Sequence, residues 1–399
     1  DVTGVQTCAL PISAGAMARA AVRLGRREAG MTRAPRTLPP GAIIGIVGGG
    51  QLGRMLALAA ARLGYQCHVY SPERDACAFQ VVGRRTVASY SDRVALRRFA
   101  RDCDVITYEF ENVPAATARW LARHAPVLPK PPVLETTQDR LIEKTFLRGL
   151  GISTVPFAAL NADAELERAA AVTGLPAVLK TRRFGYDGKG QATVKSSRDL
   201  LRAWRAMKGA PCILEGYEPF EREVSVIVAR GMNGRTACFD VTENVHRDHI
   251  LRESIVPARI SPALAAQACR MARSIARKLE YVGVLAVEMF VTRAARGHEL
   301  LVNEIAPRVH NSGHWTLDGA SVSQFEQHIR AIVGLPLLTP ATTGRVRMIN
   351  LIGPDTRRAA AWAARRDAQV HLYGKRGSRP GRKMGHVTVV KRPRRSTAK

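Results

Sequence analysis

A short apolar run and the glycine-rich turn that follows it constrain the fold of this chain more than any other feature. Residues 42–48 read AIIGIVG, a continuous apolar run typical of a parallel strand that is buried on both faces. The turn GGGQLG at 48–53 follows, and RMLALAAARLGY then predicts a helix that ends at Gly64. Strand and helix patterns alternate as far as PVL at 126–128. This alternation predicts an open, parallel α/β sheet over residues 41–135.

Beyond this sheet the patterns are more mixed. EREVSVIVAR alternates polar and apolar residues, as a half-buried strand does, and 261–281 predicts a long amphipathic helix. VGVLAVEMFVTR and HELLVNEI predict a hairpin that turns at 294–297. Short strand patterns later in the chain predict a small β cap over 339–390. The chain is therefore expected to combine α/β and α+β parts.

The net charge of +28 is concentrated at the two ends of the chain. Residues 1–40 carry six Arg against two acids, and residues 375–399 carry ten Lys or Arg and no acid, so the ends hold half of the excess. Net charge affects association rather than fold. Because aromatic residues make up only 6% of the chain, a nucleic-acid-binding face is not predicted, and we expect no specific nucleic-acid partner.

The ends of the chain show no periodicity that relates to its body. Residues 1–40, which include DVTGVQTCALPIS, predict a non-native or disordered leader, and 391–399 predict a basic, disordered tail after a shortened cap. Seven scattered cysteines without a C-x-x-C pair indicate reduced thiols in a cytoplasmic protein. No run approaches the roughly 18 apolar residues that span a membrane, so we expect no membrane partner.

The motif GGGQLG fits a phosphate-binding turn between a strand and a helix. In that context backbone N–H groups and a helix N-terminus can approach a phosphate. A dinucleotide fold also needs an acid at the end of the second strand, where this chain has Tyr70 and Ser71. An NAD site is therefore disfavoured. Two interpretations stay open, the binding of another phosphate and a tight turn that only permits close helix packing.

A second glycine-rich turn, GYDGKGQ at 185–191, follows the predicted strand that carries Lys180. Flexible glycines, Lys189 at the tip and Lys180 on a strand form a candidate cradle for the negative oxygens of phosphoryl transfer. The turn lacks the G-x-x-x-x-G-K-[ST] pattern, so a P-loop fold is not indicated. An exposed turn without a ligand is the alternative.

The predicted hairpin places two carboxylates opposite each other. A turn centred near Arg296 pairs residues whose numbers sum to about 592, and Glu288 and Glu304 have that sum. Facing carboxylates about 5 Å apart are destabilising unless they are compensated, and Mg²⁺ bound through carboxylates and substrate phosphates compensates them. Asn303 adds a neutral oxygen. Two solvated surface glutamates are the alternative, which the apolar neighbours LAVEMF and LLVNEI disfavour.

The segment APRVHNSGHWT at 306–316 gathers polar donors just after these carboxylates. Arg308 is a natural bidentate anchor for a carboxylate or carbonate. His310 and His314 have either a direct or a structural role. A transition-metal site is not indicated, because no helix carries a His pair at i, i+4.

Together these segments resemble the 5-(carboxyamino)imidazole ribonucleotide synthases, ATP-grasp ligases of purine biosynthesis that form the ATPase subunit of phosphoribosylaminoimidazole carboxylase. The resemblance covers residues 43–390 and is carried by GGGQLGRML, ENVP, RRFGYDGKGQ, LEGYEPFEREVSV, YVGVLAVEMF, NEIAPRVHNSGHWT and GRKMGH. It implies a Rossmann-like pre-ATP-grasp domain, an ATP-grasp domain over 136–338 with a lid at about 153–220, and the C-terminal cap. The implied reaction carboxylates 5-aminoimidazole ribonucleotide with ATP and bicarbonate, in a cytoplasmic homodimer.

The resemblance also implies roles for single residues. Contacts with ATP are implied for Arg140, Lys180, Gly185, Tyr186, Asp187, Gly188, Lys189, Gly190, Gln191, Glu215, Gly216, Tyr217, Glu218, Glu223, His246, Asn303 and Glu304. Contacts with the ribonucleotide are implied for Gly50, Gln51, Leu52, Glu111, Asn311, Lys375 and Arg382. The implied metal ligands, for Mg²⁺ with Mn²⁺ as the alternative, are Glu288, Glu304 and Asn303. The implied catalytic residues are Arg308, Lys180, Tyr186 and Asp187.

Functions of other classes stay open beside this one. Another ATP-grasp carboxylase or a formate-using ribonucleotide ligase would share the paired carboxylates and the lid, but APRVHNSGHWT argues against both. A nucleotide-binding regulator without turnover would keep the glycine-rich turns and would not need the paired carboxylates.

Overall fold

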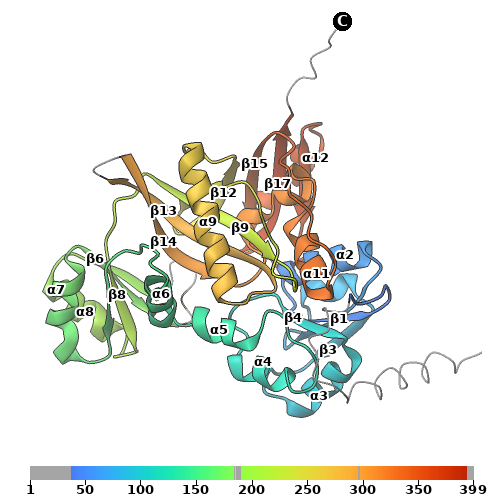
Figure 1. Cartoon of the computed structure of the whole chain (residues 1–399), viewed down its shortest axis with the longest axis horizontal. Coiled ribbons are helices and arrows are strands. Elements are labelled where there is room, and N and C mark those ends of the chain that lie inside the picture. The colour runs from blue at the N-terminus through green and yellow to red at the C-terminus, as the bar shows by residue number, and fades with distance from the viewer. Residues whose placement is uncertain (1–36, 184, 186–189, 295–296, 393–399) are drawn as a thin grey trace, which may run out of the picture. The chain divides into compact units, whose positions relative to one another are not determined.

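The computed structural model describes residues 37–183, 185, 190–294 and 297–392. Within these residues the strands form three sheets, whose elements are labelled in Figure 1. Two sheets have four strands, and the third has nine.

The first sheet has the strand order β3-β2-β1-β4, with parallel pairing throughout. Its segment contains β1 (Ile43–Val47), α2 (Gln51–Arg62), β2 (Gln66–Ser71), the 3₁₀ turn η1 (Cys77–Val81), β3 (Arg84–Val87), α3 (Arg93–Asp102), β4 (Val105–Tyr108), α4 (Ala115–Leu121) and α5 (Pro131–Thr137). The predicted parallel sheet is confirmed. The sequence did not predict β3, because this edge strand reads RRTV and is mostly exposed, without apolar alternation.

The second sheet is small and antiparallel, with the order β5-β8-β6-β7. We call it the small sheet. Its segment contains α6 (Arg140–Gly149), β5 (Phe157–Leu160), η2 (Asp163–Glu165), α7 (Leu166–Thr173), β6 (Ala177–Thr181), β7 (Gln191–Val194), α8 (Ser197–Ala206) and β8 (Cys212–Gly216). Figure 1 shows α7 and α8 lying side by side next to this sheet, and Trp204 of α8 is buried in its core.

The third sheet has the order β14-β13-β9-β11-β12-β15-β17-β16, with β10 also paired to β9. We call it the large sheet. Its segment contains β9 (Arg222–Arg230), β10 (Thr236–Cys238), β11 (Thr242–Arg247), β12 (Ile250–Val256), α9 (Pro262–Lys278), β13 (Gly283–Ala294), β14 (Gly297–Ala306), η3 (Asn311–Gly313), α10 (Thr316–Gly319), α11 (Gln324–Val333), β15 (Arg345–Ile352), η4 (Gly353–Arg358), α12 (Ala359–Ala363), β16 (Ala368–Leu372) and β17 (Lys383–Lys391). In Figure 1, α9 lies across one face of this sheet. Its small and branched residues Ala268, Ala272 and Ile275 are fully buried there.

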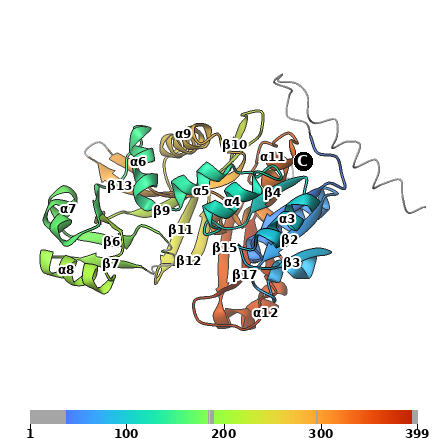
Figure 2. The ribbon, with the colours of Figure 1, turned by 90° about the horizontal axis from the view of Figure 1, so that it is seen from below.

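The strands of the predicted C-terminal cap belong to the large sheet. β12 pairs with β15 in antiparallel fashion, so the cap continues this sheet rather than forming one of its own. Figure 2 shows β15 and β17 following β12 side by side in the sheet, with α12 at their far end. This continuity attaches the cap rigidly to the strands that carry the hairpin.

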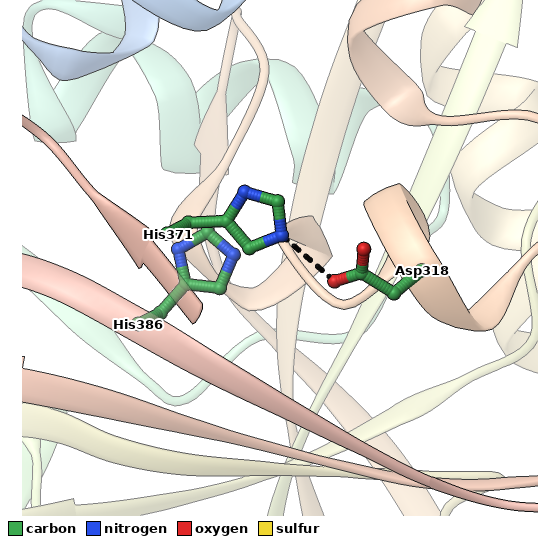
Figure 3. Close-up of side chains that lie close together, drawn as sticks. All are labelled: Asp318, His371 and His386. Atoms are coloured by element: carbon green, nitrogen blue, oxygen red, sulfur yellow. Dashed lines mark hydrogen bonds and ion pairs between the residues drawn. The ribbon is translucent and has the colours of Figure 1, made fainter. Parts of the chain in front are cut away.

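Side chains of α10 and of the cap meet in a cluster that Figure 3 shows. Asp318 accepts a hydrogen bond from Nε2 of His371 at 2.9 Å, and the hydroxyl of Tyr373 lies 2.9 Å from Nδ1 of His386. The rings of His371 and His386 stack at 4.6 Å with an angle of 11° between them. Because parallel rings direct their nitrogen lone pairs side by side and not toward one point, this arrangement suits packing rather than metal binding. The cluster therefore ties the cap to α10.

Among the described helices, none combines the length and the apolar character that crossing a membrane requires.

Candidate active site

The two predicted carboxylates face each other across the hairpin. Glu288 of β13 pairs with Glu304 of β14, and the register shifts directly beside this pair, where Met289 faces Val302. Asn303 is therefore an extra residue, a β-bulge that bends the strand and redirects side chains. Both Asn303 and Glu304 line the same cavity as a result. The predicted pairing is confirmed.

Each carboxylate of this pair has a basic partner. Nη1 of Arg140 lies 3.0 Å from Glu304, and Nε2 of His310 lies 3.1 Å from Glu288. Burial alone raises the pKa of Glu288, but His310 and then His246 outweigh it and bring the pKa to about 2. Glu288 is therefore ionised at neutral pH. These two basic residues offset the repulsion that facing carboxylates create.

A cavity of about 690 Å³ brings the three sheets together around this pair. The residues implied by the sequence that line it are Gln51, Leu52, Glu111, Arg140, Lys180, Gly185, Gln191, Glu215, Gly216, Tyr217, Glu218, Glu223, His246, Glu288, Asn303, Glu304, Arg308 and Asn311. The described part of its lining does not include Gly50, Gly190, Lys375 or Arg382. Tyr186, Asp187, Gly188 and Lys189 lie outside the described residues.

A buried carboxylate holds the strand lysine in place. Glu215 of β8 is 3% exposed, and its Oε2 accepts a hydrogen bond from Nζ of Lys180 at 2.7 Å. Lys144 of α6, which is fully buried, lies 3.8 Å from Oε1. Burial raises the pKa of Glu215, but Lys144 and Lys180 overcome it and lower the pKa to about 2. Lys144 was not predicted, because nothing in the local sequence of α6 shows that Glu215, about 70 residues further along the chain, lies beside it.

Helix α6 also supports the hairpin from behind. Glu143 is buried and accepts a hydrogen bond from the backbone N–H of Ile305. Burial and the nearby Glu304 raise the pKa of Glu143 to about 8. Asp139 caps the helix by accepting from Leu141 and Ile142, which fixes the direction in which Arg140 leaves its first turn.

Arg308 is held by a carboxylate of the protein itself. Its Nε and Nη2 both donate to Glu111, the second bond at 2.9 Å, so the pair is bidentate. Burial raises the pKa of Glu111, but the Arg308 guanidinium more than offsets this and lowers it to about 2. Nη1 donates to the carbonyl of Val309 at 3.2 Å. If Arg308 anchors a carbonate, it would therefore do so while it is bound to Glu111.

The glycine-rich turn before α2 is closed by a carboxylate. The buried side chain of Glu109 accepts hydrogen bonds from the backbone N–H groups of Gly50 and Gly53, the latter at 2.6 Å. A Cβ atom on Gly50 would lie 2.6 Å from Oε1 of Glu109. Close packing thus requires these glycines, and a phosphate would reach the two N–H groups only by displacing Glu109. Gln51 and Leu52 nevertheless line the cavity.

Two basic residues of the cap, Lys375 and Arg382, bond to backbone carbonyls beside the cavity. Nζ of Lys375 donates to the carbonyl of Lys383 at 2.8 Å, and burial lowers the pKa of Lys375 to about 8. Arg382 donates to the carbonyls of Arg376 and Gly377. Lys383, which the sequence analysis did not select, lines the cavity instead.

The site contains an oxygen that suits a hard cation. Oδ1 of Asn303 is buried and has no hydrogen-bond partner among the described residues. With the carboxylates of Glu288 and Glu304 it forms an all-oxygen set, which Mg²⁺ prefers. The side chain of Asn311 is less available to a ligand, because it exchanges two hydrogen bonds with Asn350.

The paired hairpin carboxylates, the small sheet with its lysine, and the preceding parallel sheet define the class of ATP-grasp ligases. The family model of the ATP-grasp domain matches residues 145–325 of this chain. The family model of the ribonucleotide synthetase preATP-grasp domain matches residues 42–138. The phosphoribosylaminoimidazole carboxylase C-terminal domain matches 347–399. The predicted fold class is thus confirmed.

Comparison with known proteins narrows this class to one family. The N5-carboxyaminoimidazole ribonucleotide synthase of Brucella melitensis is 50% identical over 357 residues, which cover 89% of this chain and 98% of the relative. The Bacillus subtilis synthase is 43% identical, over 89% of this chain and 93% of its own. A crystal structure of a synthetase in complex with ADP aligns with a TM-score of 0.85 and 44% identity, over 90% of this chain and 94% of that one. The chain belongs to the N5-carboxyaminoimidazole ribonucleotide synthase family.

Proposed function

We propose that this chain converts 5-aminoimidazole ribonucleotide, bicarbonate and ATP into N5-carboxyaminoimidazole ribonucleotide, ADP and phosphate, as a step of purine biosynthesis. The observation that carries the proposal is the pair Glu288 and Glu304, which the bulge at Asn303 brings into one cavity with Lys180. An Aspergillus clavatus relative, 33% identical with a TM-score of 0.81 over 88% of this chain and 94% of its own, has been crystallised with ADP and 5-aminoimidazole ribonucleotide.

ATP is proposed to bind between the small sheet and the large sheet. Lys180 and Arg140 bring positive charge to the part of the cavity next to Glu304, where the phosphates would lie. Glu215 holds Lys180 by a hydrogen bond of 2.7 Å, so this ammonium group is preorganised. The remaining ATP contacts implied by the resemblance, including Glu223 and His246, belong to this proposal.

Glu288, Glu304 and the amide oxygen of Asn303 are proposed to hold Mg²⁺, or Mn²⁺ in its place. Bound there, the ion would offset the negative charge that develops on the phosphate oxygens. Arg140 and His310 already contact these carboxylates and orient both groups. Because the two carboxylates are already held in place, they need to move little when the metal ion binds.

The chemistry is proposed to begin when bicarbonate attacks the γ-phosphate of ATP and forms carboxyphosphate. Arg308, oriented by Glu111, would hold the carbonate portion. Because carboxyphosphate hydrolyses readily, the turn at 185–191 must exclude water until the exocyclic amine of the ribonucleotide attacks. We propose that Tyr186 and Asp187 position this amine and that Asp187 accepts its proton.

The ribonucleotide is proposed to occupy the end of the cavity near α2. Gln51 and Leu52 of α2 line the cavity, as do Glu111 and Asn311, which supports this placement. The contacts of Gly50, Lys375 and Arg382 with the 5′-phosphate stay a prediction from the resemblance.

A homodimer in the cytoplasm completes the proposal. It rests on the family resemblance, and sedimentation analysis of the purified chain tests the dimer.

The decisive experiment measures ADP release with Mg²⁺ and ATP, adding bicarbonate and 5-aminoimidazole ribonucleotide separately and together. We expect ADP release to rise sharply only when the ribonucleotide is present, and label from isotopic bicarbonate to appear in the ribonucleotide. ADP release without transfer of the label, or stimulation by another acceptor only, would overturn the proposed function.

A further inference from the structure

Two of the cysteines differ from the rest in exposure. The described residues contain six free cysteines, of which Cys67, Cys77, Cys103 and Cys212 are buried. Cys238 at the end of β10 and Cys269 on α9 are partly exposed. The described lining of the active-site cavity includes neither thiol, so the proposed chemistry does not use them.

These two cysteines are also neighbours in space. Sγ of Cys238 donates to the carbonyl oxygen of Cys269 at 3.9 Å, so the Cys238 side chain lies against the residue that carries the second thiol. β10 packs beside α9, and both side chains contact the edge of the same apolar core. A disulfide requires an S–S distance of about 2.05 Å, which two cysteines on adjoining elements reach by rotation of their side chains.

The surroundings make the two thiols unequal. Cys238 and the Arg273 guanidinium, one helical turn along α9, together lower the pKa of Cys269 to about 7 against the effect of burial and of Asp240. The neighbouring Cys269, together with burial, raises the pKa of Cys238. Because the thiolate is the nucleophile, Cys269 is the thiol that attacks first.

We propose that Cys238 and Cys269 form a reversible redox pair, which a peroxide converts into an intramolecular disulfide. The Cys269 thiolate attacks one oxygen of hydrogen peroxide, the O–O bond breaks, and a sulfenic acid and hydroxide form. The hydroxide becomes water by taking up, from solvent, the proton that the Cys269 thiol had released. The Cys238 sulfur then attacks the sulfenic sulfur and loses its proton, and the leaving hydroxide takes up that proton as water. Two thiols are oxidised by two electrons, and one peroxide is reduced to two waters. A dithiol reductant reverses the change.

The test treats the full chain with hydrogen peroxide, blocks the remaining thiols and digests with trypsin. Cleavage at the arginines places the two cysteines in separate peptides, residues 236–247 and 260–270. We expect these peptides to be joined, with a mass two hydrogens below their sum, and to separate after reduction. Cys269→Ser must abolish the joined species, whereas the buried control Cys67→Ser must retain it. Recovery of both peptides unlinked, while other cysteines oxidise, would overturn the proposal.

A second measurement tests the order of the two steps. In Cys238→Ser no second thiol can close the disulfide, so a sulfenic acid should accumulate at Cys269 and react with dimedone. Cys269→Ser should show no such label at Cys238. Equal labelling in the two variants would contradict the assignment of Cys269 as the attacking thiol. Because the label is read by mass, this result does not depend on the ligase activity.

Discussion

Glu288 and Glu304 stand opposite each other at the one position where a bulge interrupts the described β13–β14 pairing. Between the bulge and the turn, the residue numbers of each pair add up to 591, as in Ala294 with Gly297. The residue numbers of the two glutamates add up to 592. If the turn-side register continued without the bulge, Asn303 rather than Glu304 would stand opposite Glu288. The bulge is thus what creates a carboxylate pair with an amide oxygen beside it.

Removing either carboxylate charge should abolish turnover without unfolding the protein. We expect Glu288→Gln and Glu304→Gln each to reduce kcat by at least about 100-fold, because each removes an electrostatic contact in a preorganised site. Steady-state ADP release at increasing Mg²⁺ measures this. Glu299→Gln on the exposed part of β14 is the matched control and should keep normal kinetics. Normal turnover in both site variants would remove the pair from the mechanism.

The contact between Gly50 and Glu109 predicts a cost for any side chain at residue 50. Gly50→Ala would bring a Cβ atom within 2.6 Å of Oε1 of Glu109, so the carboxylate must leave its hydrogen bonds to Gly50 and Gly53. We expect a loss of about 1–3 kcal/mol in the free energy of unfolding, measured in urea. Gly83→Ala is the control, because a Cβ there meets no atom within 4 Å. Equal stability of the two variants would show that Glu109 moves away freely.

The sequence predicted the elements whose signal is local. The apolar run at 42–48 and the glycine-rich turn were sufficient to predict β1 and α2 within a parallel sheet. The register of the hairpin was predicted from a turn centred near Arg296, half a residue from the midpoint of the pair Ala294 and Gly297. The bulge shifts the register by one residue. The predicted register is therefore correct for Glu288 and Glu304, and it is one residue off between the bulge and the turn.

The remaining features depend on contacts between distant segments. Glu109 and Gly50 meet only because β1 and β4 are neighbours, and periodicity does not report which buried carboxylate caps which helix. Lys144 looks like an ordinary helix residue until the small sheet places Glu215 beside it. The predicted cap merges with the large sheet because β12 is long enough to pair with β15, which local strand patterns cannot show.

The low pKa of Glu215 predicts a pH-dependent contribution to stability. Its pKa is about 2 in the folded protein against 4.5 for an ordinary glutamate, so its stabilising effect is present above about pH 4.5 and is lost as the pH falls toward 2. We expect Glu215→Gln to cost about 3–5 kcal/mol at pH 7, because Lys144 is then buried without a countercharge.

The same variant should cost less in acid. At pH 4 an unfolded glutamate is mostly protonated while folded Glu215 stays ionised, so the difference between wild type and variant should shrink by about 0.8 kcal/mol. Urea unfolding of both proteins at pH 7 and pH 4 measures this change, with Glu299→Gln as the exposed control. A difference that stays constant or grows toward pH 4 would contradict the assignment.

The bidentate pair of Arg308 and Glu111 separates two roles for the arginine. If Arg308 contacts the carbonate directly, Arg308→Lys should lower kcat by about 100-fold or more, since lysine cannot reproduce the planar fork. Glu111→Gln keeps an oxygen that can accept from Arg308 and should lower kcat far less. If Arg308 acts only by holding Glu111, the two variants should lose equal activity, and the double variant should lose no more than either alone. Turnover rates of the three variants at saturating bicarbonate decide between these outcomes, and equal losses would exclude direct contact with the carbonate.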